Sequence, residues 1–165
     1  MKKVIPFLLA LGLALPAISQ DFQAINQISF KNKKDYKEHE PEVLQCADYL
    51  LSNPLDKNSL EQKVALRLII QWSSGTPDFT FELDGTLSEL MKKNDDVLPV
   101  LMTAMVKFAL DHPDQVDDKK QMKLHTYEIF IDYCKDEKNG VKQSKELKKA
   151  IQAKEDGKLE SYLGL

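Results

Sequence analysis

The most apolar stretch of the chain lies near its middle. Within residues 97–110 only one proline, one threonine and one lysine interrupt a run of apolar residues. Apolar positions recur at helical spacing and also occupy the other faces, which predicts a helix surrounded by other helices. Pro99 fits the first turn of such a helix, where its missing N–H is harmless. We therefore expect a central helix over residues 95–111, with Asn94 or Asp95 as its N-cap.

Amphipathic segments lie on both sides of this central one. Apolar residues at three- and four-residue spacing, bounded by proline, serine and glycine, predict further helices. Their expected ranges are 41–51, 60–74, 86–93, 114–135 and 144–155. Ser59 and Gln62 have the spacing of a capping box before the second of these, which we expect to pair with the central helix. The predicted fold class is all-α, a single irregular bundle of five to six helices.

One segment has the alternating pattern of a β-strand. Phe79, Phe81 and Leu83 alternate with polar residues. Because a lone strand cannot form a sheet, we expect residues 76–85 to be an extended connector that presses these apolar side chains onto the helices.

The first 19 residues have the pattern of a secretory signal peptide. Two lysines precede a short apolar region, and Ala17-Ile18-Ser19 is a small-x-small cleavage site. A membrane anchor is the alternative, but the apolar region is shorter than the ~20 residues that a spanning helix needs. We therefore expect a cleaved signal peptide (1–19), a polar N-terminal arm (20–40) and a helical domain (41–165). The mature protein would be periplasmic or secreted, with no transmembrane segment.

Charge argues against one class of partner. The chain has a formal net charge of −3, and loss of the two signal-peptide lysines leaves 21 basic and 26 acidic side chains. A mildly acidic surface does not favour nucleic acid as a partner.

Cys46 and Cys134 are the two cysteines. An oxidising compartment permits a disulfide, and on that ground we favour a bridge between them. Two buried free thiols are the alternative, because cysteine is among the most buried residue types.

Acids and histidines gather after the central helix. The group comprises Asp111, His112, Asp114, Asp117, Asp118 and His125. These are metal-ligand types, so a metal-dependent hydrolase using the His112–His125 region is one alternative function. The two histidines do not have zinc-ligand spacing, however, and an acid-rich helix start explains the same residues. We expect no metal site, no cofactor and no catalytic residue, since motifs for nucleophiles and phosphate loops are also absent from the sequence.

The least generic segment is Trp-Ser-Ser-Gly-Thr-Pro-Asp-Phe-Thr-Phe at residues 72–81. Gly75 as a helix stop and Pro77 predict a tight exit that lets Trp72 pack against Phe79. The alternative is an open binding surface for a small apolar ligand. That surface would comprise Trp72, Gly75, Thr76, Pro77, Asp78 and Phe79.

Together with Glu40-Pro41, a Tyr-Leu-Leu-Ser helix end and Asn53-Pro54, this segment resembles a group of uncharacterised exported helical proteins of Bacteroidetes-type bacteria. They share a W-x-x-G-T-P-[DE]-[FY] segment, and the resemblance covers residues 40–84. It implies export and a helical fold, and it brings no activity with it. The function that we expect is a non-enzymatic interaction or accessory module of the cell envelope, with an unknown protein partner.

Overall fold

The structure is a computed structural model, and it describes residues 21–81, 85–92 and 94–165. Over these residues it is helical without β-strands, which confirms the predicted all-α class. The signal peptide prediction and Leu83 lie outside the described residues. The helices in chain order are α1 (Phe22–Gln27), α2 (Lys33–Glu38), α3 (Glu40–Ser52), α4 (Leu60–Ser73), α5 (Gly85–Met91), α6 (Val97–Asp111), α7 (Lys119–Lys135), the 3-10 turn η1 (Glu137–Asn139), α8 (Lys145–Glu155) and α9 (Leu159–Leu163).

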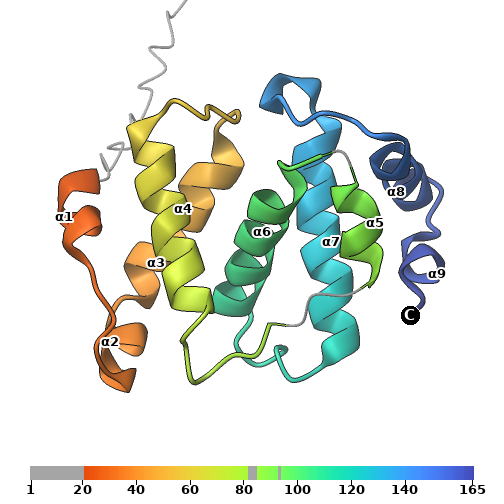
Figure 1. Cartoon of the computed structure of the whole chain (residues 1–165). Helices are drawn as coiled ribbons and strands as arrows, with labels where there is room; N and C mark the ends of the chain where they lie inside the picture. The colour runs from red at the N-terminus through yellow and green to blue at the C-terminus, as the bar shows by residue number, and fades with distance from the viewer. Residues whose placement is uncertain (1–20, 82–84, 93) are drawn as a thin grey trace, which may run out of the picture.

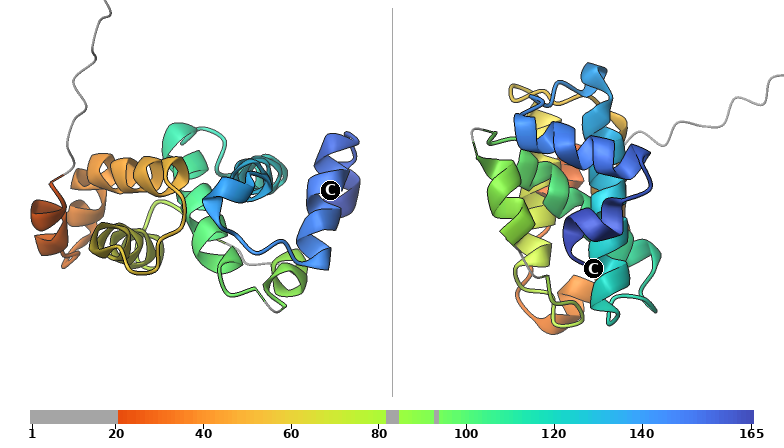
Figure 2. Two further views of the ribbon diagram at one scale, coloured as in Figure 1. Left: turned by 90° about the horizontal axis from the view of Figure 1, so that it is seen from above. Right: turned by 90° about the vertical axis from the view of Figure 1, so that its right-hand side faces the viewer.

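Helix α6 is the central element, as its apolar sequence predicts (Figure 1). Helices α3 and α7 pack against it from opposite sides, and α4 contacts both α3 and α6. The short helices α1 and α2 lie against α4 and α3 at one end of the molecule. Helices α8 and α9 lie beyond α7 at the other end (Figure 2). The predicted pairing of residues 60–74 with the central helix is therefore present, although α4 packs mainly on α3.

Helix α6 contributes to two hydrophobic clusters. Val97 and Leu101, near its start, pack in one cluster with α5, α7, α8 and α9. Val106, near its end, packs in the other with α3, α4 and the N-terminal helices. Full burial of each such side chain stabilises the fold by roughly 1.5–3 kcal/mol relative to exposure. Because α6 packs into both clusters, apolar residues are buried on all sides of this helix.

The start of α6 differs in detail from the prediction. The helix begins at Val97, so Pro99 is in its first turn as expected. Asp96 is the N-cap residue, but its side chain makes no capping hydrogen bond. Buried Asn94 instead donates through Nδ2 to the carbonyl of Lys142 at 2.6 Å, which ties the entry of α6 to the segment before α8.

Helix α7 begins five residues later than predicted, at Lys119. The Asp118 carboxylate accepts from the backbone N–H groups of Lys120 and Gln121 at 3.0 and 3.1 Å. A side chain that satisfies the first N–H groups defines a helix start, so the acids before Asp118 lie in the preceding turn rather than in the helix.

Residues 21–40 contain two short helices where we expected an arm. An Asn32–Asp35 capping box starts α2, and Arg67 of α4 holds α1. The Arg67 guanidinium donates to the carbonyls of Ile25 and Asn26 at 3.3 and 3.2 Å, which are among the last carbonyls of α1. A basic side chain at a helix C-terminus satisfies carbonyls that lack partners within the helix.

Candidate functional site

Trp72 belongs to the core and not to a binding surface. Its side chain is fully buried, and its indole N–H donates to the carbonyl of Tyr36 at 3.0 Å. Its ring lies 5.4 Å from Phe79 and 6.1 Å from Phe81, centroid to centroid. The predicted packing of Trp72 against Phe79 is therefore present, and the connector aromatics cover the end of α4 as expected.

Gly75 has a different role from the one predicted. We expected a left-handed helix stop, but the glycines with positive φ among the described residues are Gly140, Gly157 and Gly164. A Cβ added at Gly75 would lie 2.1 Å from the hydroxyl oxygen of Tyr36. Glycine thus leaves room here for the close approach of another side chain, which sequence spacing alone does not reveal.

The other residues of the predicted binding surface lie in the turn after α4 or border a pocket. Thr76 accepts from the backbone N–H of Asp78 through Oγ1 at 3.4 Å, and Pro77 and Asp78 are exposed. Phe79 is half-buried. Asp78 and Phe79 border a pocket that the sequence did not indicate.

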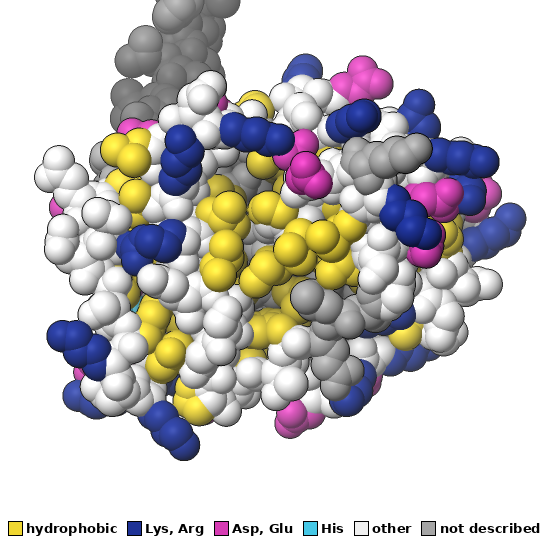
Figure 3. Space-filling view, viewed as in Figure 1, with side chains coloured by type: hydrophobic (Ala, Val, Ile, Leu, Met, Phe, Trp, Pro, Cys, Tyr) yellow, Lys and Arg dark blue, Asp and Glu magenta, His cyan; other side chains and the backbone are white. Residues whose placement is uncertain are grey.

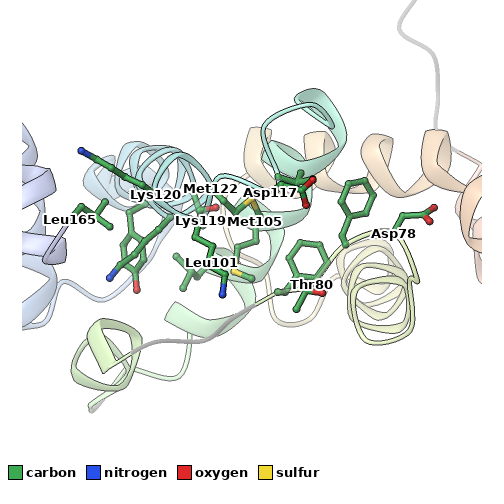
Figure 4. A pocket seen from close by; sticks show the side chains of 15 residues that line it. Asp78, Thr80, Leu101, Met105, Asp117, Lys119, Lys120, Met122 and Leu165 are labelled. Carbon is green, nitrogen blue, oxygen red and sulfur yellow. The ribbon is translucent and has the colours of Figure 1, made fainter.

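This pocket has a volume of about 580 Å³. It lies between the connector, α6, the loop before α7, the first turns of α7 and the C-terminal residue (Figure 4). Its lining residues are Asp78, Phe79, Thr80, Phe81, Leu101, Met105, Val116, Asp117, Lys119, Lys120, Met122, Lys123, Thr126, Tyr127 and Leu165. The volume falls within the range of about 300–1,000 Å³ that small-molecule pockets occupy.

The lining is apolar at its centre and charged at its edges. Leu101, Met105 and Met122 lie together in the middle of the pocket (Figure 4). Methionine side chains are flexible and polarisable, so they adapt to apolar ligands of different shape. The wider surface has a related pattern, because apolar side chains gather over the middle of one face and basic side chains, with acidic ones among them, lie around its edge (Figure 3).

Sequence reasoning placed these residues on inward helix faces but could not identify the pocket. Leu101 belongs to the expected central helix over residues 95–111 and Met122 to the expected amphipathic helix over residues 114–135. A pocket arises where two inward faces meet without filling the space between them, and this depends on helix positions that the sequence pattern does not specify. Leu165 carries no signal at all, because its place beside α7 follows from the path of α8 and α9.

The two histidines that follow α6 in the sequence, His112 and His125, pack against an aromatic ring. His112 and His125 both contact Phe108, with ring centroids 4.9 and 5.1 Å away. His125 also lies 2.6 Å from a carboxylate oxygen of Glu128 through Nδ1 and 3.0 Å from Gln121 Oε1 through Nε2. Within the described residues, no group of three or more His, Cys, Asp or Glu side chains is placed to hold a metal ion.

The favoured disulfide is wrong. Cys46 and Cys134 are free, fully buried thiols. Cys46 lies on α3 in one hydrophobic cluster and Cys134 on α7 in the other, and α6 stands between these helices (Figure 1). Burial raises the pKa of the Cys46 thiol to about 12, and burial also raises the pKa of Cys134. Both groups are therefore protonated at neutral pH, and neither has the lowered pKa of a nucleophilic cysteine.

Comparison of the chain with models of known families, with curated proteins and with solved structures finds no match. None of the helices over the described residues has both the length and the apolar character required to span a membrane.

Proposed function

We propose that the protein is a non-enzymatic accessory protein that holds a small, mostly apolar ligand in the pocket between α6, α7 and the connector. The observation that carries this proposal is the pocket of about 580 Å³ with Met105 and Met122 at its centre. An apolar lining with a few polar groups at the edge is the usual composition of a ligand site. The proposed binding region thus includes the end of the segment at residues 72–81, with Phe79, and does not include Trp72.

The metal-dependent hydrolase is the weaker candidate. Its histidines face Phe108, and His125 is engaged by Gln121 and Glu128. This arrangement supports a packing role at the start of α7. The two functions can be tested separately, since only the hydrolase requires a metal for its activity.

We also propose export to the cell envelope, which is supported by the signal-peptide pattern of residues 1–19 and by the resemblance to exported helical proteins. Fractionation of the native host, with mass measurement of the N-terminus, tests this point. A mature chain that begins at Gln20 in the envelope fraction supports it, and a full-length chain in the cytosol contradicts it.

Ligand binding is tested with a neutral fluorescent apolar probe, N-phenyl-1-naphthylamine. Met122→Trp fills the pocket from α7, and Met91→Trp makes the same change at an exposed site on α5 that does not line it. We expect wild-type and Met91→Trp proteins to bind the probe alike and Met122→Trp to bind at least about tenfold more weakly, which corresponds to ~1.4 kcal/mol. Native mass spectrometry of the purified protein provides a second readout. Equal binding by both variants, with both folded, would contradict the proposal.

A further inference from the structure

The pocket is elongated. Its labelled lining residues follow one another from Leu165 at one end, past Met122 and Met105, to Thr80 and Asp78 at the other (Figure 4). The apolar part of this row, from Leu165 past Met122 to Met105, would contact an extended hydrocarbon chain along its length. A compact, round ligand would touch only part of the row.

Charge is distributed unevenly along this length. Lys120 lies towards the Leu165 end and Lys119 lies between Lys120 and Met105, whereas Asp117 and Asp78 lie towards the opposite end (Figure 4). Lys123, from the next turn of α7, also lines the pocket. Lysine stems cover apolar surface while their ammonium groups stay at the water boundary. The part of the row between Leu165 and Met105 is therefore bordered by positive charge.

Helix α9 positions two of these lysines. Lys123 donates through Nζ to the carbonyl of Leu163 at 2.7 Å. Lys120 Nζ lies 2.6 Å from a carboxylate oxygen of Glu160, and both side chains are about half exposed. Because Glu160 shares the charge of Lys120, we expect a moderate preference for anions at this end and not a strong one.

We propose that the pocket binds a single-chain amphiphile with an anionic headgroup, in chemical class an alkyl carboxylate. The inference rests on the proposed ligand-binding function and specifies its ligand. The chain lies along Leu101, Met105 and Met122, and the carboxylate lies on the side of the pocket bordered by Lys119 and Lys120. Carboxylate and ammonium groups there form charge-assisted hydrogen bonds at the edge of an apolar site.

Three probes of equal chain length test the headgroup. Dodecanoate, dodecanol and dodecyltrimethylammonium, each below its micelle-forming concentration, compete with the neutral fluorescent probe. We expect dodecanoate to bind about threefold to tenfold more tightly than dodecanol, dodecyltrimethylammonium to bind most weakly, and added salt to reduce these differences.

Matched variants then assign the preference to the lysines. Lys119→Gln/Lys120→Gln removes two charges at the pocket, and Lys33→Gln/Lys63→Gln removes two exposed charges on α2 and α4. The first should bind dodecanoate and dodecanol with equal affinity, and the second should keep the wild-type preference. Thermal midpoints show whether each variant is folded.

Each result has a separate meaning. Equal binding of the three compounds by wild-type protein, or an unchanged preference in Lys119→Gln/Lys120→Gln, overturns the anionic headgroup. Failure of all three to displace a bound probe overturns the extended chain. Both leave the proposed apolar site intact, whereas absence of probe binding to wild-type protein overturns the proposed function itself.

Discussion

Tyr36 of α2 occupies the space that a side chain at Gly75 would need. A Cβ at Gly75 would lie 2.1 Å from the Tyr36 hydroxyl oxygen and 2.8 Å from Cζ, and Tyr36 itself stacks on Phe30 with ring centroids 4.6 Å apart. This close contact, together with the hydrogen bond from the Trp72 indole to the Tyr36 carbonyl, fits α2 against the exit of α4.

Gly75→Ala should therefore destabilise the fold by displacing Tyr36. Overpacking typically costs ~1–3 kcal/mol, and we expect a value near the lower end because Tyr36 is only half-buried and can move. Chemical unfolding of Gly75→Ala, Tyr36→Ala and the double variant measures the coupling. In the Tyr36→Ala background the substitution at Gly75 should cost little. A full cost in that background would mean that Tyr36 is not the cause.

Trp72 should act through stability. Truncation of a buried aromatic to alanine costs ~3–5 kcal/mol, and Trp72→Ala also leaves the Tyr36 carbonyl without its indole donor. Trp72→Phe keeps most of the ring packing and should cost less. Because Trp72 is the only tryptophan, wild-type emission should be blue-shifted and resistant to quenchers. A red-shifted spectrum that is easily quenched would contradict its burial.

Two buried threonines should respond in opposite directions to the same change. Thr103 and Thr126 are each 2 % exposed. The Thr103 hydroxyl donates to the Pro99 carbonyl at 2.8 Å, whereas the Thr126 hydroxyl has no hydrogen-bond partner among the residues that the structure describes. Thr103→Val should cost ~0.5–1.5 kcal/mol, and Thr126→Val should be neutral or stabilising by up to ~1 kcal/mol, as measured by the free energy of unfolding. A clear loss in Thr126→Val would show that its hydroxyl is satisfied in solution.

The two thiols should label only when the protein unfolds. Cys46 and Cys134 are fully buried and protonated at neutral pH, so a maleimide should react slowly with the native protein. Denaturation without reductant should release both thiols. Full protection after such denaturation would show that the cysteines are bridged.

Alkaline pH should destabilise the protein partly through these thiols. The folded protein keeps Cys46 protonated up to about pH 12, whereas the unfolded chain loses the proton near pH 9. The stabilising effect is therefore complete below pH 9 and declines as the pH rises towards 12, by at most ~1.4 kcal/mol per pH unit for each thiol. Cys46→Ala should reduce the slope of unfolding free energy against pH between about pH 9 and 11. Tyr133, whose pKa burial also raises to about 12, remains in both proteins, so the difference in slope isolates the thiol. Equal slopes would contradict the assignment.

The sequence predicted the long helices well, and it did not predict the short helices or several of the long-range contacts. The period of apolar residues located α3, α4, α6 and α8 to within two residues at each end, because those helices are long and bury one face or more. Helices α1, α2 and α9 are short and depend on tertiary contacts such as the Arg67 bonds, which no local pattern contains.

Long-range pairing explains the two main errors at the candidate sites. An oxidising compartment would permit a disulfide between Cys46 and Cys134. Whether the two sulfurs meet, however, depends on the positions of α3 and α7. The role of Gly75 was also misassigned because it depends on a distant residue. A Cβ at Gly75 would meet Tyr36, which lies 39 positions away in the sequence. The pocket follows the same rule, because its walls come from four separate parts of the chain.

Helix α6 connects the two halves of the molecule along the chain and also by packing, because it contributes side chains to both hydrophobic clusters. Its first turns support the cluster built by the C-terminal helices, and its last turns support the cluster built by the N-terminal ones. Fraying of the first turns of α6 would thus weaken the cluster built by the C-terminal helices. Fraying of its last turns would weaken the cluster built by the N-terminal helices. The two clusters are therefore expected to lose amide protection together, as one cooperative unit, and not as two independently opening subdomains.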